Sequence, residues 1–306
     1  MTPRNRVRDL IEYLAVRMVL KMLELLPPVS AKALAGKVAT LASLFTPRWR
    51  HVAYHNLDIA LPKTNPATRR QIVNGVYQNL GRILFTLSQT PRLNTENIHD
   101  WVEYEGYDHF QRALQRGKGV LFMTGHLGNW ELSATAQSLL HHPMHVIVRS
   151  FDNPLIDKLI DGYRTFHGNR TIHKQHYGRS LLRALRNNEA VGVLVDQNTT
   201  ERDAIFVNFF GVRASSTTGI TKVAMKTGAA VIPGFALWDD RKGHYLLKFY
   251  PPLELAQTGN FEEDLEVNTQ LCQATIEEVV RNHPDQWLWI HRRWKRRPEG
   301  QAELYF

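Results

Sequence analysis

The first 26 residues carry a helical pattern of apolar and polar positions. Spacings of three and four residues place seven apolar side chains on one face of a predicted helix: Val7, Leu10, Ile11, Leu14, Met18, Met22 and Leu25. Arg17, Lys21 and Glu24 fall on the other face, and the basic residues Arg4, Arg6 and Arg8 precede it. This pattern is typical of a helix that lies in a membrane interface, and it also fits a first helix packed on a core. We predict a membrane-associating amphipathic helix over residues 1–26.

The pattern changes near residue 100. Residues 27–95 predict helices broken at prolines, whereas short apolar runs alternate with helical segments from residue 100 on. The predicted strands cover 101–106, 119–124, 144–149, 171–174, 190–196, 230–237 and 244–250. The predicted helices between and after them cover roughly 130–140, 154–166, 178–187, 216–227 and 263–282.

Alternation of this kind indicates an α/β fold with a mostly parallel, mixed sheet flanked by helices and a helical N-terminal portion. The stretch from 237 to 250 predicts an antiparallel hairpin at one end of the sheet. We expect residues 27–306 to form a single domain, helical over 27–95 and α/β over 100–306.

One predicted strand runs directly into "GHLGNWE", residues 125–131. Glycines allow a sharp turn and a close approach of ligand, and the carboxyl ends of parallel strands border a crevice. His126 in that turn can serve as a general base. Glu131, at the start of the next helix, can then hold one ring nitrogen and leave the other free for substrate. The alternative is a helix-capping histidine with an unrelated surface glutamate.

Two further strands end in polar residues at the same edge, "VIVR-SFDNP" and "VGVLV-DQN". Arg149 in the first suits either a phosphate contact or a structural salt bridge. Asp196 in the second suits either the site or the cap of a turn.

Several chemistries lack their motif in this sequence. A G-x-S-x-G elbow, an H-E-x-x-H or paired-cysteine site and the glycine-rich phosphate loops are all absent. The lone cysteine, Cys272, stands in a helical segment and is predicted to be buried. We therefore expect no metal and no cofactor, and a base that activates a hydroxyl of the substrate for direct attack, without a covalent enzyme intermediate.

The charge favours an anionic partner. Lys and Arg number 38 against 29 Asp and Glu, which gives a net charge of +9. Nucleic acid, an anionic membrane face and an acidic protein all fit this balance. Neither a secretory signal nor an apolar run long enough for a transmembrane helix is evident.

Several stretches together resemble a known family, the lipid A late acyltransferases of Gram-negative envelope synthesis, within the lysophospholipid acyltransferase superfamily. The H-x4-E motif of "GHLGNWE" is accompanied in the same order by "RHVAYHNLDIALP", "VRSFDNPLIDKLIDGYR", "VLVDQN", "VNFFGVRASSTTGITKVAMKTGAAVIP" and "PDQWLWIHRRWKRRPEG". The likeness covers about residues 50 to 300.

The resemblance implies an acyl thioester donor, acyl carrier protein or CoA, and a hydroxyl of a lipid A precursor as acceptor, with no metal. His126 is then the general base and Glu131 its partner. The family positions that line the site correspond to Arg149, Asn153, Arg164, Asp196 and Gln197. The "GNW" before Glu131 also suits relatives that acylate another glycolipid, such as a phosphatidylinositol mannoside. Arg164 or the backbone N–H groups after His126 are candidates for stabilising the oxyanion.

The run "WLWIHRRWKRR" leaves a different class of function open. Aromatic residues interleaved with cations bind single-stranded nucleic acid, and they also anchor proteins at anionic membranes. We interpret it locally as a terminal strand with Trp287 and Trp289 in the core and its arginines solvated. With the N-terminal helix and the resemblance, this favours peripheral or monotopic attachment to the cytoplasmic face of the inner membrane, and no nucleic-acid partner.

Overall fold

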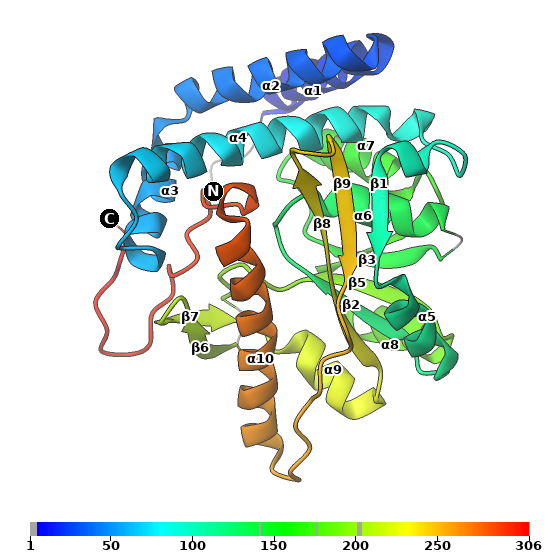
Figure 1. Cartoon of the computed structure of the whole chain (residues 1–306), viewed down its shortest axis with the longest axis vertical. Helices are drawn as coiled ribbons and strands as arrows, with labels where there is room; N and C mark the ends of the chain where they lie inside the picture. Colours follow the sequence, from blue (N-terminus) through cyan, green and yellow to red (C-terminus); the bar gives the residue numbers. More distant parts are fainter. Residues whose placement is uncertain (1–4, 141, 175–176, 201–203, 306) are drawn as a thin grey trace.

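A seven-stranded mixed sheet forms the centre of the computed structural model, which describes residues 5–140, 142–174, 177–200 and 204–305 (Figure 1). The strand order is β1-β9-β8-β2-β5-β3-β4. Five neighbouring strands from β8 to β4 run parallel, and β9 and β1 run against them. The strands are β1 (Val102–Glu105), β2 (Val120–Thr124), β3 (Met144–Val148), β4 (Arg170–His173), β5 (Ala190–Leu194), β8 (Ala230–Asp239) and β9 (His244–Phe249). The predicted fold class is confirmed.

Helices cover both faces of the sheet, because successive residues of a strand point to opposite sides. In β2, Val120 and Phe122 pack with α5 and α6, whereas Leu121 and Met123 pack with α8, α9 and α10. This is why the central strands are apolar throughout. The helices of this part are α5 (Tyr107–Gln115), α6 (Trp130–Leu139), α7 (Pro154–Thr165), α8 (Tyr177–Arg186), α9 (Gly219–Thr227) and α10 (Phe261–Asn282).

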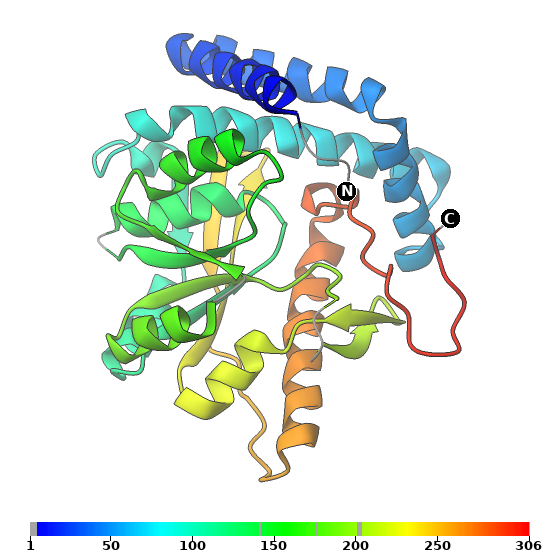
Figure 2. The same cartoon turned by 180° about the vertical axis from the view of Figure 1, so that it is seen from behind.

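The N-terminal region is helical, as predicted. It comprises α1 (Arg6–Leu25), α2 (Pro28–Phe45), α3 (Pro47–Ala60) and α4 (Pro66–Gln89). Proline opens α2, α3 and α4, where its missing N–H costs no intrahelical bond. The long α4 crosses one end of the sheet, and α1 and α2 lie on its outer side (Figures 1 and 2).

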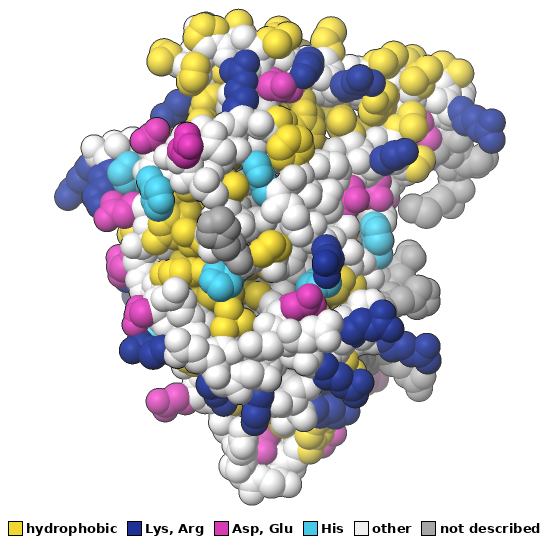
Figure 3. Space-filling view, turned by 90° about the vertical axis from the view of Figure 1, so that its right-hand side faces the viewer, with side chains coloured by type: hydrophobic (Ala, Val, Ile, Leu, Met, Phe, Trp, Pro, Cys, Tyr) yellow, Lys and Arg dark blue, Asp and Glu magenta, His cyan; other side chains and the backbone are white. Residues whose placement is uncertain are grey.

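The apolar face predicted for α1 is exposed. Its seven large side chains, from Val7 to Leu25, are between 39% and 68% exposed, while α1 buries only Asp9, Leu20 and Leu23. Exposed Val29, Leu41, Leu44 and Phe45 of α2 extend the surface. We call these eleven residues the α1–α2 surface; hydrophobic side chains gather along this end of the molecule in Figure 3. Arg4 lies outside the described residues. None of the helices in the described ranges is long and apolar enough to cross a membrane.

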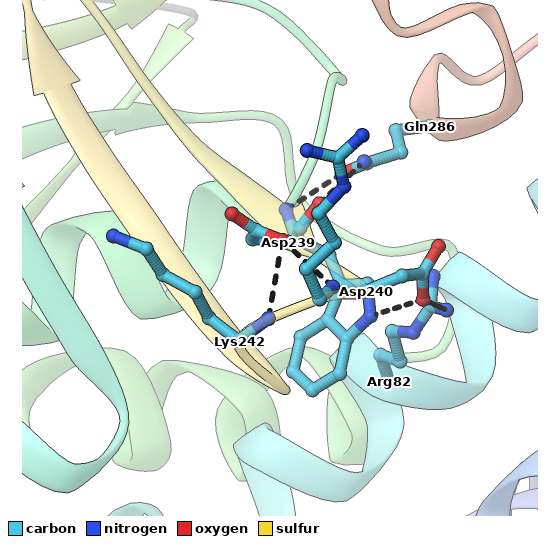
Figure 4. Close-up of polar contacts among 7 residues, drawn as sticks. Arg82, Asp239, Asp240, Lys242 and Gln286 are labelled. Carbon is cyan, nitrogen blue, oxygen red and sulfur yellow. Dashed lines mark hydrogen bonds and ion pairs between the residues drawn. The ribbon is translucent and has the colours of Figure 1, made fainter.

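The predicted hairpin is confirmed, with β8 and β9 antiparallel, but β1 pairs with the outer side of β9. The hairpin is therefore not the edge of the sheet. Its turn is fixed by Asp239, which accepts from the N–H groups of Arg241 and Lys242 (Figure 4). The side chain of Gln286 pairs with the backbone N–H and C=O of Trp238 in β8, and so ties the C-terminal segment to the sheet.

Three local predictions differ from the structure. Residues 205–216 form a second, separate hairpin, β6 (Ile205–Phe209) and β7 (Val212–Ser216), so the next helix begins at Gly219 and not at residue 216. The tryptophan-rich terminal segment forms no named strand in the described ranges. Trp287 and Trp289 are buried as expected, and Trp294 is buried too. Arg293 between them is also fully buried, against the expectation of solvated arginines.

Candidate active site

A cavity of about 370 Å³ lies where β3 and β5 separate at their carboxyl ends. The pairing of these two strands stops at Val146 and Gly192, although β3 stays paired with β4 up to Val148 and β5 with β2 up to Leu194. Residues 146–148 and 193–195 all line the cavity. Since three consecutive residues of a strand face both sides, the cavity extends between the two strands.

His126 stands at this cavity in the turn after β2, and the backbone is closely packed at Gly125 and, above all, at Gly128. A side chain at Gly128, whose φ is +61°, would place its Cβ 2.0 Å from the carbonyl oxygen of Ala236. A Cβ at Gly125 would lie 3.1 Å from Cγ of Asp196. The turn therefore presses the backbone against β8 on one side and against the carboxylate on the other, and it orients the histidine toward the cavity.

Asp196 is the hydrogen-bond partner of His126. Its Oδ2 accepts from the main-chain N–H of His126 at 2.8 Å, and Oδ1 lies 2.9 Å from Nδ1 of the ring. The indole N–H of Trp287 donates to Oδ2 at 2.8 Å. Burial by itself would raise the pKa of Asp196, but the charge of His126 and these hydrogen bonds outweigh it and lower the pKa to about 2.

This arrangement fixes the imidazole. An ionised carboxylate only accepts hydrogen bonds, so the ring proton of neutral His126 resides on Nδ1. Nε2 then carries the lone pair, and none of the described residues hydrogen-bonds to it. The edge of the His126 ring meets Trp130, with ring centroids 5.0 Å apart. His126 therefore has the orientation and tautomer of a general base.

Glu131 lines the same cavity but contacts Arg164, not His126. Nε of Arg164 lies 3.0 Å from Oε2, and its terminal nitrogen lies 2.6 Å from Oε1, which makes a bidentate pair between α6 and α7. Burial would lower the pKa of Arg164, but the charge of Glu131 and its hydrogen bonds raise it. The expected hydrogen bond between Glu131 and His126 is therefore wrong: the carboxylate points to α7, and Asp196 takes its place at the ring.

The other expected site residues divide into two groups. Arg149 and Gln197 line the cavity, as does Arg164. Asn153 does not line it: its side-chain oxygen caps α7, and its amide donates to the carbonyl oxygen of Asp9 in α1. The predicted place of Asn153 in the cavity wall is therefore wrong. The physical reason is that an asparagine directly before a proline that opens a helix serves as the N-cap.

His291 is a cavity residue that the sequence reasoning missed. It belongs to the terminal tryptophan-rich run, and its Nε2 accepts from the backbone N–H of Asn198 at 3.0 Å. Burial lowers the pKa of His291 to about 4, so the ring is neutral near neutral pH. The only available signal was the "WIHRRW" block, because nothing in the local spacing links it to the loop after β5.

Apolar side chains make up much of the remaining cavity wall. They come from α6, β3, β5, α8 and α9, and include Ala134, Val146, Leu181, Val193 and Ile220. The described residues contain no group of three or more His, Cys, Asp and Glu that is arranged to hold a metal ion. The site thus joins a histidine, a buried carboxylate and an ion pair to an apolar slot.

The known proteins that are similar to this chain belong to one class of enzyme. A family model described as bacterial lipid A biosynthesis acyltransferase matches residues 2–296. The chain is 27% identical over 271 residues to the lipid A biosynthesis lauroyltransferase of Escherichia coli K12, covering 87% of this chain and 85% of the relative. It is 26% identical over 273 residues to the palmitoleoyltransferase of the same organism, covering 89% and 87%. It is 21% identical over 282 residues to the myristoyltransferase, covering 92% and 86%.

Proposed function

The chain belongs to the bacterial lipid A biosynthesis acyltransferases, and from this premise we propose that it transfers a fatty acyl chain from a thioester of acyl carrier protein or CoA to a hydroxyl of a lipid A precursor. The observation that carries the proposal is the His126–Asp196 pair at a cavity with a largely apolar wall. Such a cavity suits an acyl chain, and such a pair suits removal of a proton from a hydroxyl.

In the proposed reaction, Nε2 of His126 takes the proton of the acceptor hydroxyl while that oxygen attacks the thioester carbonyl carbon. Asp196 holds Nδ1–H and stabilises the imidazolium that forms. The tetrahedral oxyanion then collapses, the C–S bond breaks, and the proton on Nε2 passes to the leaving thiolate. The products are an ester and a free thiol.

Direct attack is favoured over an acyl-enzyme route. The thiol of Cys272 is buried in α10, away from the cavity wall, and burial raises its pKa to about 12. A thiol with such a pKa carries almost no thiolate near neutral pH, and the thiolate is the nucleophile.

We assign Glu131 to positioning and Arg164 to substrate. The bidentate pair fixes the guanidinium at the cavity wall, where it can face the developing oxyanion or a phosphate of the acceptor. Arg149 is exposed at the cavity and carries the second cation suited to an acceptor phosphate. Gln197 also lines the cavity and suits a hydrogen bond to a sugar or amide group.

We further propose peripheral attachment to the cytoplasmic face of the inner membrane through the α1–α2 surface. A contiguous exposed apolar surface on two adjacent helices is costly in water and marks an interaction site. Insertion of this surface into the headgroup region buries the apolar residues, and the net charge of +9 favours an anionic membrane.

The structure gives little support to the two alternative functions, acylation of another glycolipid and binding of nucleic acid. Asn129 of "GNW" is buried, caps α6 and donates to Thr86, so only Trp130 of that triplet lines the cavity. Transfer to another glycolipid, such as a phosphatidylinositol mannoside, therefore rests on Trp130 alone. Trp287, Trp289 and Trp294 are at most 1% exposed, so they cannot stack on the bases of a nucleic acid.

The test is acyl transfer by the purified protein with acyl-acyl carrier protein or acyl-CoA as donor, followed by mass spectrometry of the lipid product. We expect one acyl chain to be added to a lipid A precursor. Transfer to a phosphatidylinositol mannoside with no transfer to the lipid A precursor would contradict the proposed acceptor. Release of free fatty acid as the only product, with every acceptor tried, would contradict acyl transfer to lipid.

A further inference from the structure

Arg293 is fully buried behind the active site, in the terminal segment that follows α10. One terminal nitrogen of its guanidinium donates to the carbonyl oxygen of Ser215 at 2.6 Å. The other donates to Oγ of Ser216 at 2.7 Å and to Oε1 of Gln273 at 3.0 Å. The arginine thus connects β7, α10 and the terminal segment.

None of these three acceptors carries a charge. Among the described residues, no carboxylate forms an ion pair with Arg293, and its Nε is buried without a hydrogen-bond partner. The ring of Phe209, with its centroid 5.1 Å from Cζ, compensates only part of a buried positive charge. Burying a cation is expensive unless an opposite charge is near. A cross-link between neutral groups needs no cation, so the charge itself requires an explanation.

Asp196 supplies the opposite charge. Gln273, which accepts from Arg293, donates from Nε2 to the carbonyl oxygen of Val195 at 2.8 Å, one residue before Asp196. The carboxylate is only 1% exposed, and its hydrogen-bond donors are His126 and Trp287. Burial lowers the pKa of Arg293 to about 10, and the charge of Asp196 is the main influence that opposes this. A buried anion and a buried cation are therefore linked through Gln273 and the backbone of Val195.

We propose that Arg293 is a positioning residue for the acyl transfer: its positive charge complements the buried carboxylate of Asp196, which donors from His126 and Trp287 already hold ionised, and so helps to keep the ring proton of His126 on Nδ1. The same positive charge disfavours a second proton on His126 until the acceptor hydroxyl delivers it. The effect of Arg293 on the rate of acyl transfer rests on the proposed function, whereas its effect on the protonation of His126 does not. His291 and Lys295 from the terminal segment and Tyr305 interact electrostatically with members of this cluster. Arg149 and the Glu131–Arg164 pair line the same cavity as His126.

The test compares Arg293→Met with Arg293→Lys in the full-length protein. Two measurements are made: the protonation of His126 against pH, followed by NMR of labelled histidine rings and assigned with His126→Ala, and the pH dependence of kcat/KM. In Arg293→Met, the pH at which His126 takes up its proton should be higher than in the wild type, because a nearby positive charge is removed, and the acid limb of kcat/KM should move with it. In Arg293→Lys, which keeps a charge but loses the bidentate geometry, both curves should stay close to the wild type.

Two further variants separate charge from packing. Ser216→Ala removes one acceptor of Arg293 and leaves its charge, so it should lower the unfolding midpoint without moving either curve. Gln273→Glu places a carboxylate against Arg293 and should move both curves in the direction of Arg293→Met, which keeps the test decisive if the methionine variant does not fold. Unmoved curves in Gln273→Glu, or an equal shift in Arg293→Lys and Arg293→Met, would overturn the role of the charge. If the wild-type protein transfers no acyl chain but its His126 titrates as expected in NMR, the proposed function is contradicted. The NMR curves of the variants then test the role of Arg293 by themselves.

Discussion

Asp196 holds His126 at two points, through the main-chain N–H at 2.8 Å and through Nδ1 of the ring at 2.9 Å. The first contact fixes the turn after β2, and the second fixes the tautomer of the base. A carboxylate from the loop after β5 therefore controls a histidine from the loop after β2, 70 residues earlier.

Asp196→Asn should keep the fold and lose most of the activity. An amide that donates to Nδ1 reverses the tautomer, so Nε2 would carry the proton and could not act as the base. We expect kcat to fall on the order of 10³–10⁴-fold with little change in KM. Steady-state kinetics on the folded variant measures this. Asp239→Asn in the β8–β9 turn is the matched control and should retain activity. A kcat within a few-fold of the wild type in Asp196→Asn would exclude tautomer control.

His126→Ala should lose about 10²–10⁴-fold in rate, because it removes the general base. Since the two residues act as a unit, His126→Ala combined with Asp196→Asn should be little worse than the poorer single variant. The exposed His51 of α3, changed to Ala, is the control. Intact-protein mass spectrometry after incubation with donor alone should detect no acylated enzyme. A covalent adduct that is chased into product by acceptor would refute direct attack.

Glu131 should act through Arg164. Glu131→Gln and Arg164→Gln should each lower kcat/KM, by about 10-fold or more, and the double variant should be no worse than Arg164→Gln alone. Arg164→Lys should fail to restore the rate, because an ammonium cannot reproduce the planar, two-point contact. Fully additive effects of the two glutamine substitutions would instead indicate that Glu131 acts independently of Arg164.

His291 should make stability fall as the pH is lowered. Its folded-state pKa of about 4 lies below the ordinary value, so below about pH 6.5 the unfolded chain takes up a proton that the folded protein refuses. The stabilisation is complete above about pH 6.5 and is lost progressively as the pH approaches 4. Urea unfolding at pH 7.5 and at pH 5 should differ by roughly 2 kcal/mol from this group. His291→Asn should lose that part of the pH dependence, while His51→Asn should keep it.

The α1–α2 surface should govern membrane binding. Ile11, Leu14 and Met18 are more than half exposed, so changing all three to Ser should leave the fold intact. Binding to vesicles with anionic lipid should weaken at least about 10-fold, since each residue loses part of the free energy of apolar burial. Flotation with vesicles measures this, with Val267→Ser on α10, half exposed outside the surface, as the control. Equal binding of the triple variant and the wild type would refute this role of α1.

Much of the fold was readable from local pattern. Each strand of the main sheet was predicted near its observed place, because apolar runs bounded by helical segments are local features. The glycines around His126 and the apolar face of α1 were readable for the same reason. The β6–β7 hairpin was not, because its strands are short and β7 ends in two serines that become buried only by packing.

The partners of the charged groups were decided only by the tertiary structure. The sequence placed Glu131 five positions from His126, whereas the contact that forms is with Asp196, because β2 and β5 are neighbours in register and the loops after them meet. Periodicity tells which face of an element is apolar, but not which strand lies beside which. In the same way, Arg293 stands in a run of basic residues that the sequence predicts to be exposed to solvent. The packing of β7 and α10 nevertheless encloses it with neutral hydrogen-bond acceptors. The sequence determined which residues with useful chemistry exist and on which turns, and the order of strands in the sheet determined which of them share a proton or a charge.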